Sequence, residues 1–163
     1  MTDFKALLRL LSEAGVEFIL VGGVAATVHG STRLTTDVDV VYRRDARNID
    51  RLVLALTPYH PYLRGAPAGL PFRWDAPTIR GGLNFTLTTD LGDLDLLGEI
   101  AGGGDYERLL PDTLSIRVFG VECRCLTLAR LIDVKRAAGR PRDLEAIAEL
   151  EAIQEHRQRG GSS

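Results

Sequence analysis

Three features of the sequence predict one α/β (α+β) domain, in which a mixed β-sheet carries helices mainly on one face. The chain has 163 residues, a length that suits a single domain with its own core. Its hydrophobic fraction of 45% and charged fraction of 26% are ordinary for a globular protein. Helical and strand patterns alternate at first, and strands and then helices follow. We expect residues 1–159 to form this domain and residues 160–163 to be a disordered tail.

The first elements have the clearest patterns. Apolar side chains recur at three- and four-residue spacings from Phe4 to Ala14, which predicts an amphipathic helix over residues 3–14 that Gly15 ends. The apolar run 16–21 predicts a buried strand that stops at Gly22-Gly23. The next predicted elements are a short helix, a polar turn, a strand and a helix, at 24–29, 30–32, 38–42 and 48–56.

The second half begins with a stretch dense in proline and glycine, residues 58–77, which predicts a loop with little regular structure. Gly120 separates two strand-like segments and predicts a hairpin. The predicted strands are 82–89, 93–97, 114–119 and 121–125, with turns or loops at 90–92 and 101–104. The predicted helices are 106–110, 128–138 and 143–158, and the last two form the C-terminal part of the domain.

Charge and hydropathy exclude some classes of protein. Lys and Arg number 20 and Asp and Glu 22, so the formal charge of −2 argues against a dedicated nucleic-acid coat protein, although not against local contact with nucleic acid. There is no apolar run long enough to cross a membrane, and the N-terminus lacks a secretory signal pattern. We therefore expect a cytoplasmic protein with no membrane partner.

The two cysteines, Cys123 and Cys125, lie one residue apart in a predicted strand. They would point to the same face, and such close neighbours seldom form an unstrained disulfide. We expect buried thiols in a reducing cytosol. A metal site built on them would need further ligands, and the chain has three histidines, of which His29 is expected to be a helix-end residue.

The most informative segment runs from the glycine pair to two aspartates. Gly22 and Gly23 would let backbone N–H groups approach an anion at a helix N-terminus, although a tight turn needs glycine on steric grounds alone. Asp37 and Asp39 are two residues apart at a predicted strand, so both point to one face. Their mutual repulsion requires a compensating cation, unless both face water on an edge strand.

A third carboxylate, Asp95, lies inside a second apolar strand, between Leu94 and Leu96, while Asp93 stands at the entrance of that strand. If the two strands are neighbours, Asp37, Asp39 and Asp95 converge. Such oxygen ligands suit Mg²⁺, and two ions about 3.5–4 Å apart are the usual arrangement for displacement at phosphorus. The sequence therefore predicts a centre for two Mg²⁺ or Mn²⁺ ions.

These residues also match a family. The glycine pair, followed by G-S-T-R-L-T-T-D-V-D at residues 30–39, resembles the active-site signature of the DNA polymerase β-like nucleotidyltransferase superfamily. The G-S-T-R-x-T-x-D-x-D form is similar to the small AbiEii-type enzymes, which include toxins of toxin–antitoxin systems. Residues 106–110 and 131–144 also resemble that group, so the resemblance covers most of residues 16–150.

The resemblance implies a polymerase β-like fold, a nucleoside triphosphate as substrate, and roles for the three acids. Asp37 and Asp39 would bind both metal ions, and Asp95 would bind the catalytic ion and help to deprotonate an acceptor hydroxyl. Gly22 and Gly23 would cradle the triphosphate through their N–H groups.

Other contacts to phosphate are less direct. Many superfamily members have Ser where this chain has Gly23, and Ser31 is a candidate to replace that hydroxyl. Arg33 and Lys135 are the expected triphosphate ligands. Alternatively, Arg33 pairs with Asp37, and Lys135 is a solvated helix residue. Arg140 and Asp143 are expected to form a cap and ion pair at the start of the last helix.

The resemblance leaves the acceptor open, because relatives modify RNA, proteins and small antibiotics. The toxin-like features favour RNA, such as a tRNA 3′ end, and an antitoxin as partner protein. Two arginine-rich stretches, 43–47 and 136–142, would contact RNA phosphates or form solvated faces. The alternatives are an antibiotic nucleotidyltransferase and a non-catalytic nucleotide-binding module that acts with a partner chain.

Overall fold

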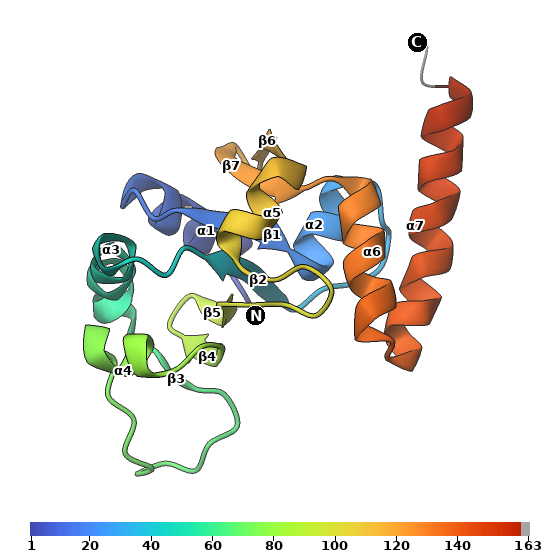
Figure 1. Cartoon of the computed structure of the whole chain (residues 1–163). Helices are drawn as coiled ribbons and strands as arrows, with labels where there is room; N and C mark the ends of the chain where they lie inside the picture. Colours follow the sequence, from blue (N-terminus) through green and yellow to red (C-terminus); the bar gives the residue numbers. More distant parts are fainter. Residues whose placement is uncertain (161–163) are drawn as a thin grey trace.

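In a computed structural model, which describes residues 1–160, a seven-stranded mixed sheet forms the centre of the molecule (Figure 1). Its strand order is β3-β4-β5-β2-β1-β7-β6, with parallel pairing at β2–β5 and β1–β7 and antiparallel pairing elsewhere. The strands are β1 (Phe18–Val21), β2 (Asp37–Tyr42), β3 (Tyr62–Leu63), β4 (Phe85–Thr89), β5 (Gly92–Leu97), β6 (Thr113–Val118) and β7 (Val121–Leu126).

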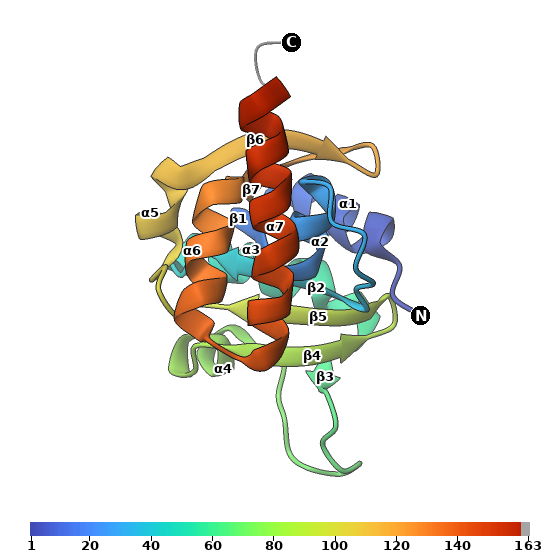
Figure 2. The ribbon, with the colours of Figure 1, turned by 90° about the vertical axis from the view of Figure 1, so that its right-hand side faces the viewer.

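Helices lie on both sides of this sheet. Figures 1 and 2 show α1 and α3 on one side and α2, α6 and α7 on the other, a more even distribution than the predicted covering of mainly one face. The α+β class with a mixed sheet is as predicted. The helices are α1 (Phe4–Glu13), α2 (Gly22–Val28), α3 (Ala46–Leu56), α4 (Ala76–Gly81), α5 (Tyr106–Leu109), α6 (Leu128–Ala138) and α7 (Pro141–Gly160), with 3₁₀ turns at Thr57–Tyr59 and Leu110–Asp112.

The alternation along β2 and β5 separates the core from the site. Val38 and Val40 on β2 and Leu94 and Leu96 on β5 are fully buried in the hydrophobic core. The residues between them are the aspartates, which must therefore point to the opposite face of the sheet. Burial of the apolar side chains thus fixes the register that turns the acids toward the face carrying α2, α6 and α7.

The helix ends follow local capping chemistry. The Asp3 side chain accepts a hydrogen bond from the backbone of Ala6 and caps α1, as its place before the apolar pattern predicts. Helix α3 begins two residues before the predicted start, because Asp45 accepts from Asn48 N at 2.8 Å and so caps an earlier turn. Helix α7 begins at Pro141, since proline suits the first turn of a helix.

The stretch expected to be a loop, residues 58–77, contains regular structure that its composition hides. Strand β3 pairs with β4, with Tyr62 opposite Thr88, and Asp75 accepts from Thr78 N at 2.9 Å to cap α4. Because α4 occupies residues 76–81, β4 begins at Phe85 and the predicted strand start at Gly82 is wrong. The β3 pairing joins segments more than 20 residues apart, so local composition cannot reveal it.

The predictions for the two cysteines and for His29 can be compared with the structure. Cys123 and Cys125 are free, buried thiols, and burial raises their pKa to about 11 and about 12, so both stay protonated near neutral pH. His29 ends α2, and one ring nitrogen, Nε2, lies 2.7 Å from the carbonyl oxygen of Leu126.

Gly160 is the last residue of α7, and residues 161–163 of the expected tail lie outside the described residues. Within residues 1–160, none of the helices has the length and apolar character needed to cross a membrane.

Candidate active site

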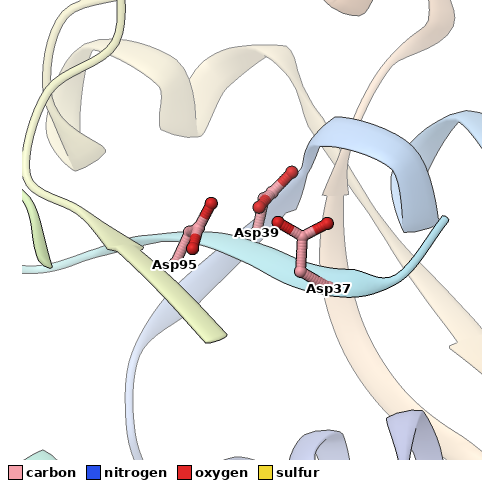
Figure 3. Close-up of side chains that lie close together, drawn as sticks. All are labelled: Asp37, Asp39 and Asp95. Carbon is pink, nitrogen blue, oxygen red and sulfur yellow. The ribbon is translucent and has the colours of Figure 1, made fainter. Parts of the chain in front are cut away.

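Three carboxylates meet on neighbouring strands, as the sequence predicts. Parallel pairing of β2 with β5 places Asp39 directly opposite Asp95, and Asp37 lies two residues before Asp39 on the same face. One oxygen of each carboxylate lies within 4.8 Å of one oxygen of each of the others. Figure 3 shows the three side chains rising from the two strands toward a common point.

This arrangement is costly without a cation. Burial, and after it the neighbouring charges of Asp37 and Asp95, together raise the pKa of Asp39 to about 8. The pKa of Asp37 is also raised. Burial is the largest cause, and the charge of Asp95 is the second. Oδ1 of Asp39 is buried and has no hydrogen-bond partner among the described residues. A buried, unpartnered oxygen next to two other carboxylates is the donor set that a divalent cation requires, so these residues fit a metal ion.

Gly22 makes room for Asp39. Its φ of +69° is in the left-handed region, and a Cβ atom at this position would lie 2.0 Å from Oδ2 of Asp39. A Cβ on Gly23 would lie 2.5 Å from the hydroxyl oxygen and 2.8 Å from Cβ of Thr35, so this position also has no room for a side chain. The glycine pair thus forms the start of α2 and lets the first turn of this helix lie close to the acids. Helix α2 begins within the pair, two residues before its predicted start.

Arg64 is a site residue that the sequence does not reveal. Its guanidinium Nη2 donates a hydrogen bond to Oδ1 of Asp95 at 2.8 Å. The same group lies 3.5 Å from Asp93 and 3.7 Å from Asp37. Arg64 directly follows β3, in the stretch expected to be an irregular loop, and no local pattern distinguishes it from the other arginines. Only the pairing of β3 with β4 brings it to the acids.

Ser31 and Arg33 lie beside the acids but have partners on α7. The hydroxyl of Ser31 donates to Oε1 of Glu149 at 2.5 Å, and the backbone N–H of Arg33 donates to that hydroxyl oxygen at 3.2 Å. The Arg33 guanidinium lies 3.6 Å from Glu145, so the predicted alternative of a pair with Asp37 is not what the structure contains. These contacts tie the loop between α2 and β2 to α7.

Lys135 is directed inward from α6. Its side chain is only 17% exposed and its Nζ lies 4.0 Å from Oδ1 of Asp143, so it is not the solvated residue of the alternative interpretation. Burial lowers its pKa, and the charges of Asp143 and Asp39 counteract that effect. Arg140 donates to Asp143 from both its backbone and its guanidinium, at 3.2 and 2.7 Å, which is the expected cap and ion pair at the start of α7.

Apart from Arg64, these groups line one cavity of about 480 Å³, a volume typical of small-molecule sites. Its walls hold the three acids together with four cationic side chains, those of Arg33, Lys135, Arg140 and Arg142. A second hollow of about 300 Å³ shares Asp39 and Lys135 with the first and has apolar walls from α6 and residues 97–101. Acids beside a group of cations can bind both a divalent metal and a polyanion.

The raised pKa of Asp39 has a measurable consequence for stability. Above its unfolded value of 3.8 and up to about 8, the folded protein holds a proton that the unfolded chain releases, so stability falls as pH rises through this range. Buried His29 has a lowered pKa and acts in the opposite direction, but only below its unfolded value of 6.5. In a chelator, the melting temperature should therefore fall between about pH 7 and 8.5.

Mn²⁺ should reverse that fall, because a bound cation removes the cost of the ionised cluster. Thermal melts of wild type and Asp39→Asn at several pH values test this. The variant should show a flatter profile and a smaller response to Mn²⁺. Equal slopes in the two proteins would contradict the assigned role of Asp39.

No protein-family model matches the sequence, and no curated protein matches it. Among solved structures, the lincosamide antibiotic adenylyltransferase LnuA with lincomycin bound is similar, with a TM-score of 0.61 and 16% identity over 94% of this chain and 98% of that one. An antigenic nucleotidyltransferase-like protein from Paracoccidioides brasiliensis matches with a TM-score of 0.56 and 17% identity, over 90% of this chain and 72% of that one. This chain therefore has the fold of these nucleotidyltransferases, as predicted, while the AbiEii subgroup stays a prediction.

Proposed function

We propose that this chain is a metal-dependent nucleotidyltransferase, which moves a nucleoside monophosphate from a nucleoside triphosphate to an acceptor hydroxyl. The observation that carries the proposal is the meeting of Asp37, Asp39 and Asp95 in one cavity with four cationic side chains. The fold shared with nucleotidyltransferases supports the same assignment. A structural role alone would not account for three clustered carboxylates, two of which, Asp37 and Asp39, oppose folding when they are ionised.

The three aspartates are the residues that would hold two Mg²⁺ or Mn²⁺ ions. When bound, such ions neutralise phosphate charge and lower the pKa of an attacking hydroxyl. Lys135 and Arg33 face the same cavity and neutralise the triphosphate, while the N–H groups of Gly22 and Gly23 approach its oxygens. Ser31 acts indirectly in this proposal, since its hydroxyl is bonded to Glu149 and holds the loop that carries Arg33.

The reaction is an in-line displacement at the α-phosphorus. A bond forms between the acceptor oxygen and the α-phosphorus, and the bond from this phosphorus to the α–β bridging oxygen breaks. Pyrophosphate leaves, and the proton of the acceptor hydroxyl passes to Asp95. The protein contributes mainly the position of the reactants and a fixed electrostatic environment.

For the acceptor, we propose the 3′ hydroxyl of an RNA, with a tRNA end as the first candidate and an antitoxin as a protein partner. The similarity of residues 30–39 to the AbiEii-type signature supports this choice. Of the arginine-rich stretches, Arg142 lines the cavity, whereas Arg43 is occupied by ion pairs with three carboxylates. A small-molecule acceptor is the second candidate, favoured by the whole-chain likeness to an adenylyltransferase that acts on a lincosamide antibiotic.

One labelling experiment separates the acceptors. The protein is incubated with each α-³²P-labelled triphosphate, Mg²⁺ or Mn²⁺, and either total RNA, cell protein or lincomycin. Label on RNA supports the first candidate, and label on lincomycin supports the second. If triphosphate binds in calorimetry but no acceptor becomes labelled, the chain is the non-catalytic nucleotide-binding module and the proposed activity is wrong.

Nucleotide affinity should depend on Lys135. Lys135→Met removes a half-buried charge from the cavity, and we expect the Kd for a triphosphate with Mg²⁺ to rise about tenfold or more. Arg136→Met is a matched control, because this neighbour on α6 is paired with Glu151 outside the cavity. Fluorescent-nucleotide titration measures both variants. Equal effects would mean that Lys135 has no special contact with the nucleotide.

A further inference from the structure

Arg64 holds an unusual position relative to the acids. Its backbone N–H donates to the carbonyl of Thr86 on β4, and Thr86 in turn is the register partner of Asp95 on β5. The next strand, β2, places Asp39 opposite Asp95. The side chain of Arg64 therefore reaches across β4 to contact Asp95, Asp93 and Asp37, at 2.8, 3.5 and 3.7 Å. Arg64 comes from the β3 edge of the sheet, whereas Lys135 comes from α6.

The hydrogen bonds of this guanidinium are incomplete. Nη2 donates to Asp95 and to the carbonyl of Leu87, at 2.8 and 2.7 Å. Nε is buried and has no hydrogen-bond partner among the described residues, although it lies 3.5 Å from Oδ1 of Asp93 in an ion pair. An arginine that served only to fix the sheet edge would be expected to use its donors more fully. Its side chain is 28% exposed and its guanidinium lies within 4 Å of three carboxylates, so the contact is mainly electrostatic.

The cluster is consequently neutralised at one end only. Asp95 has a cationic partner within hydrogen-bond distance, whereas Oδ1 of Asp39 has no hydrogen-bond partner in residues 1–160. A divalent ion can bind Oδ1 of Asp39 without displacing a hydrogen bond, and at Asp37 it meets only the longer 3.7 Å ion pair with Arg64. An ion that also binds Asp95 must share or displace the guanidinium, and the two positive groups repel each other at this distance.

We propose that Arg64 is a positioning residue that acts as the resident counter-ion of Asp95 and competes with a divalent cation for this carboxylate. The inference rests on the proposed metal centre and deepens it. Before metal binds, Arg64 keeps Asp95 facing Asp37 and Asp39 in spite of their repulsion. When metal binds at Asp95, the contact from Nη2 gives way, so the ion at this side binds more weakly than the ion at Asp39.

Mn²⁺ titration without nucleotide, followed by electron paramagnetic resonance of the free ion, tests this competition. Arg64→Met should tighten the weaker Mn²⁺ site about tenfold, because a competing and repelling charge is removed. Arg64→Gln serves as a second neutral variant that keeps a polar side chain at this position. Arg64→Lys keeps the charge and should stay within about threefold of wild type.

Arg43→Met is the matched control, since Arg43 also pairs with three carboxylates, but these are Glu17, Asp45 and Glu107 rather than the acids of the site. Its Mn²⁺ affinity should equal that of wild type. If neutral variants at Arg64 bind Mn²⁺ as wild type does, or more weakly, Arg64 only supports the sheet edge and the inference is wrong. If wild type itself binds no Mn²⁺, the metal centre of the proposed function fails, and that result is distinct.

Discussion

Asp39→Asn should abolish nucleotide transfer, with a loss of at least about a thousandfold in kcat/KM. Asparagine has nearly the same shape as aspartate but carries no charge, and its oxygen is a weaker ligand for a divalent ion. Asp39 is also the acid whose pKa is raised to about 8 and whose Oδ1 is buried without a hydrogen-bond partner among the described residues. In this variant the rate of label transfer from an α-labelled triphosphate should therefore fall, and the Kd for Mn²⁺ should rise.

The folded state should survive this substitution. Because an ionised Asp39 opposes folding near pH 8, its neutral replacement should leave the metal-free protein as stable as wild type or more so. Asp93→Asn is a suitable control, since Asp93 is on the same strand as Asp95 but outside the cluster whose oxygens converge. We expect it to keep activity within about tenfold. Transfer at the wild-type rate by Asp39→Asn would disprove the proposed mechanism.

Gly22→Ala should cause the second large effect, a loss of about a hundredfold or more in transfer together with weaker Mn²⁺ binding. The added Cβ would lie 2.0 Å from Oδ2 of Asp39, a distance that no side chain tolerates, so the carboxylate must move. The backbone adds a cost of about 1 kcal/mol, because an alanine at φ +69° is strained.

Gly120→Ala separates these two causes. Gly120 lies in the β6–β7 hairpin at φ +75°, and a Cβ there would have no described atom within 4 Å. It should therefore lower stability by a similar backbone term, about 1 kcal/mol, and leave Mn²⁺ affinity and transfer unchanged. Urea unfolding and Mn²⁺ titration of both variants give the comparison. If the Gly22→Ala and Gly120→Ala variants bind Mn²⁺ with equal affinity, Gly22 does not determine the position of the Asp39 carboxylate.

The fold was predictable where its causes are local. The apolar spacing of α1 and the continuous apolar run of β1 each follow from a few neighbouring residues, and both are found close to their predicted bounds. The ends of helices were less predictable, because a capping residue such as Asp45 can start a helix before the apolar pattern begins. Residues 58–77 were the least predictable, since β3 forms only against β4.

The candidate site was likewise predictable from the sequence only where its causes are local. The spacing of Asp37 and Asp39, and the place of Asp95 between two leucines, already put the three acids on one side of their strands. Whether the strands were neighbours was a conditional prediction, and parallel pairing of β2 with β5 confirms it. The surroundings of Lys135 and Ser31 depend on how α6 and α7 pack, which no local spacing states.

By itself, the sequence determined which residues form helices and strands in most of the chain, and that Asp37 and Asp39 share a face of their strand, because these properties depend on spacings of two to four residues. Only the tertiary structure decided that Arg64 reaches Asp95 and that Gly22 borders Asp39. Those neighbours are brought together by strand order and helix packing, and these arise from burial of the whole core rather than from any short segment.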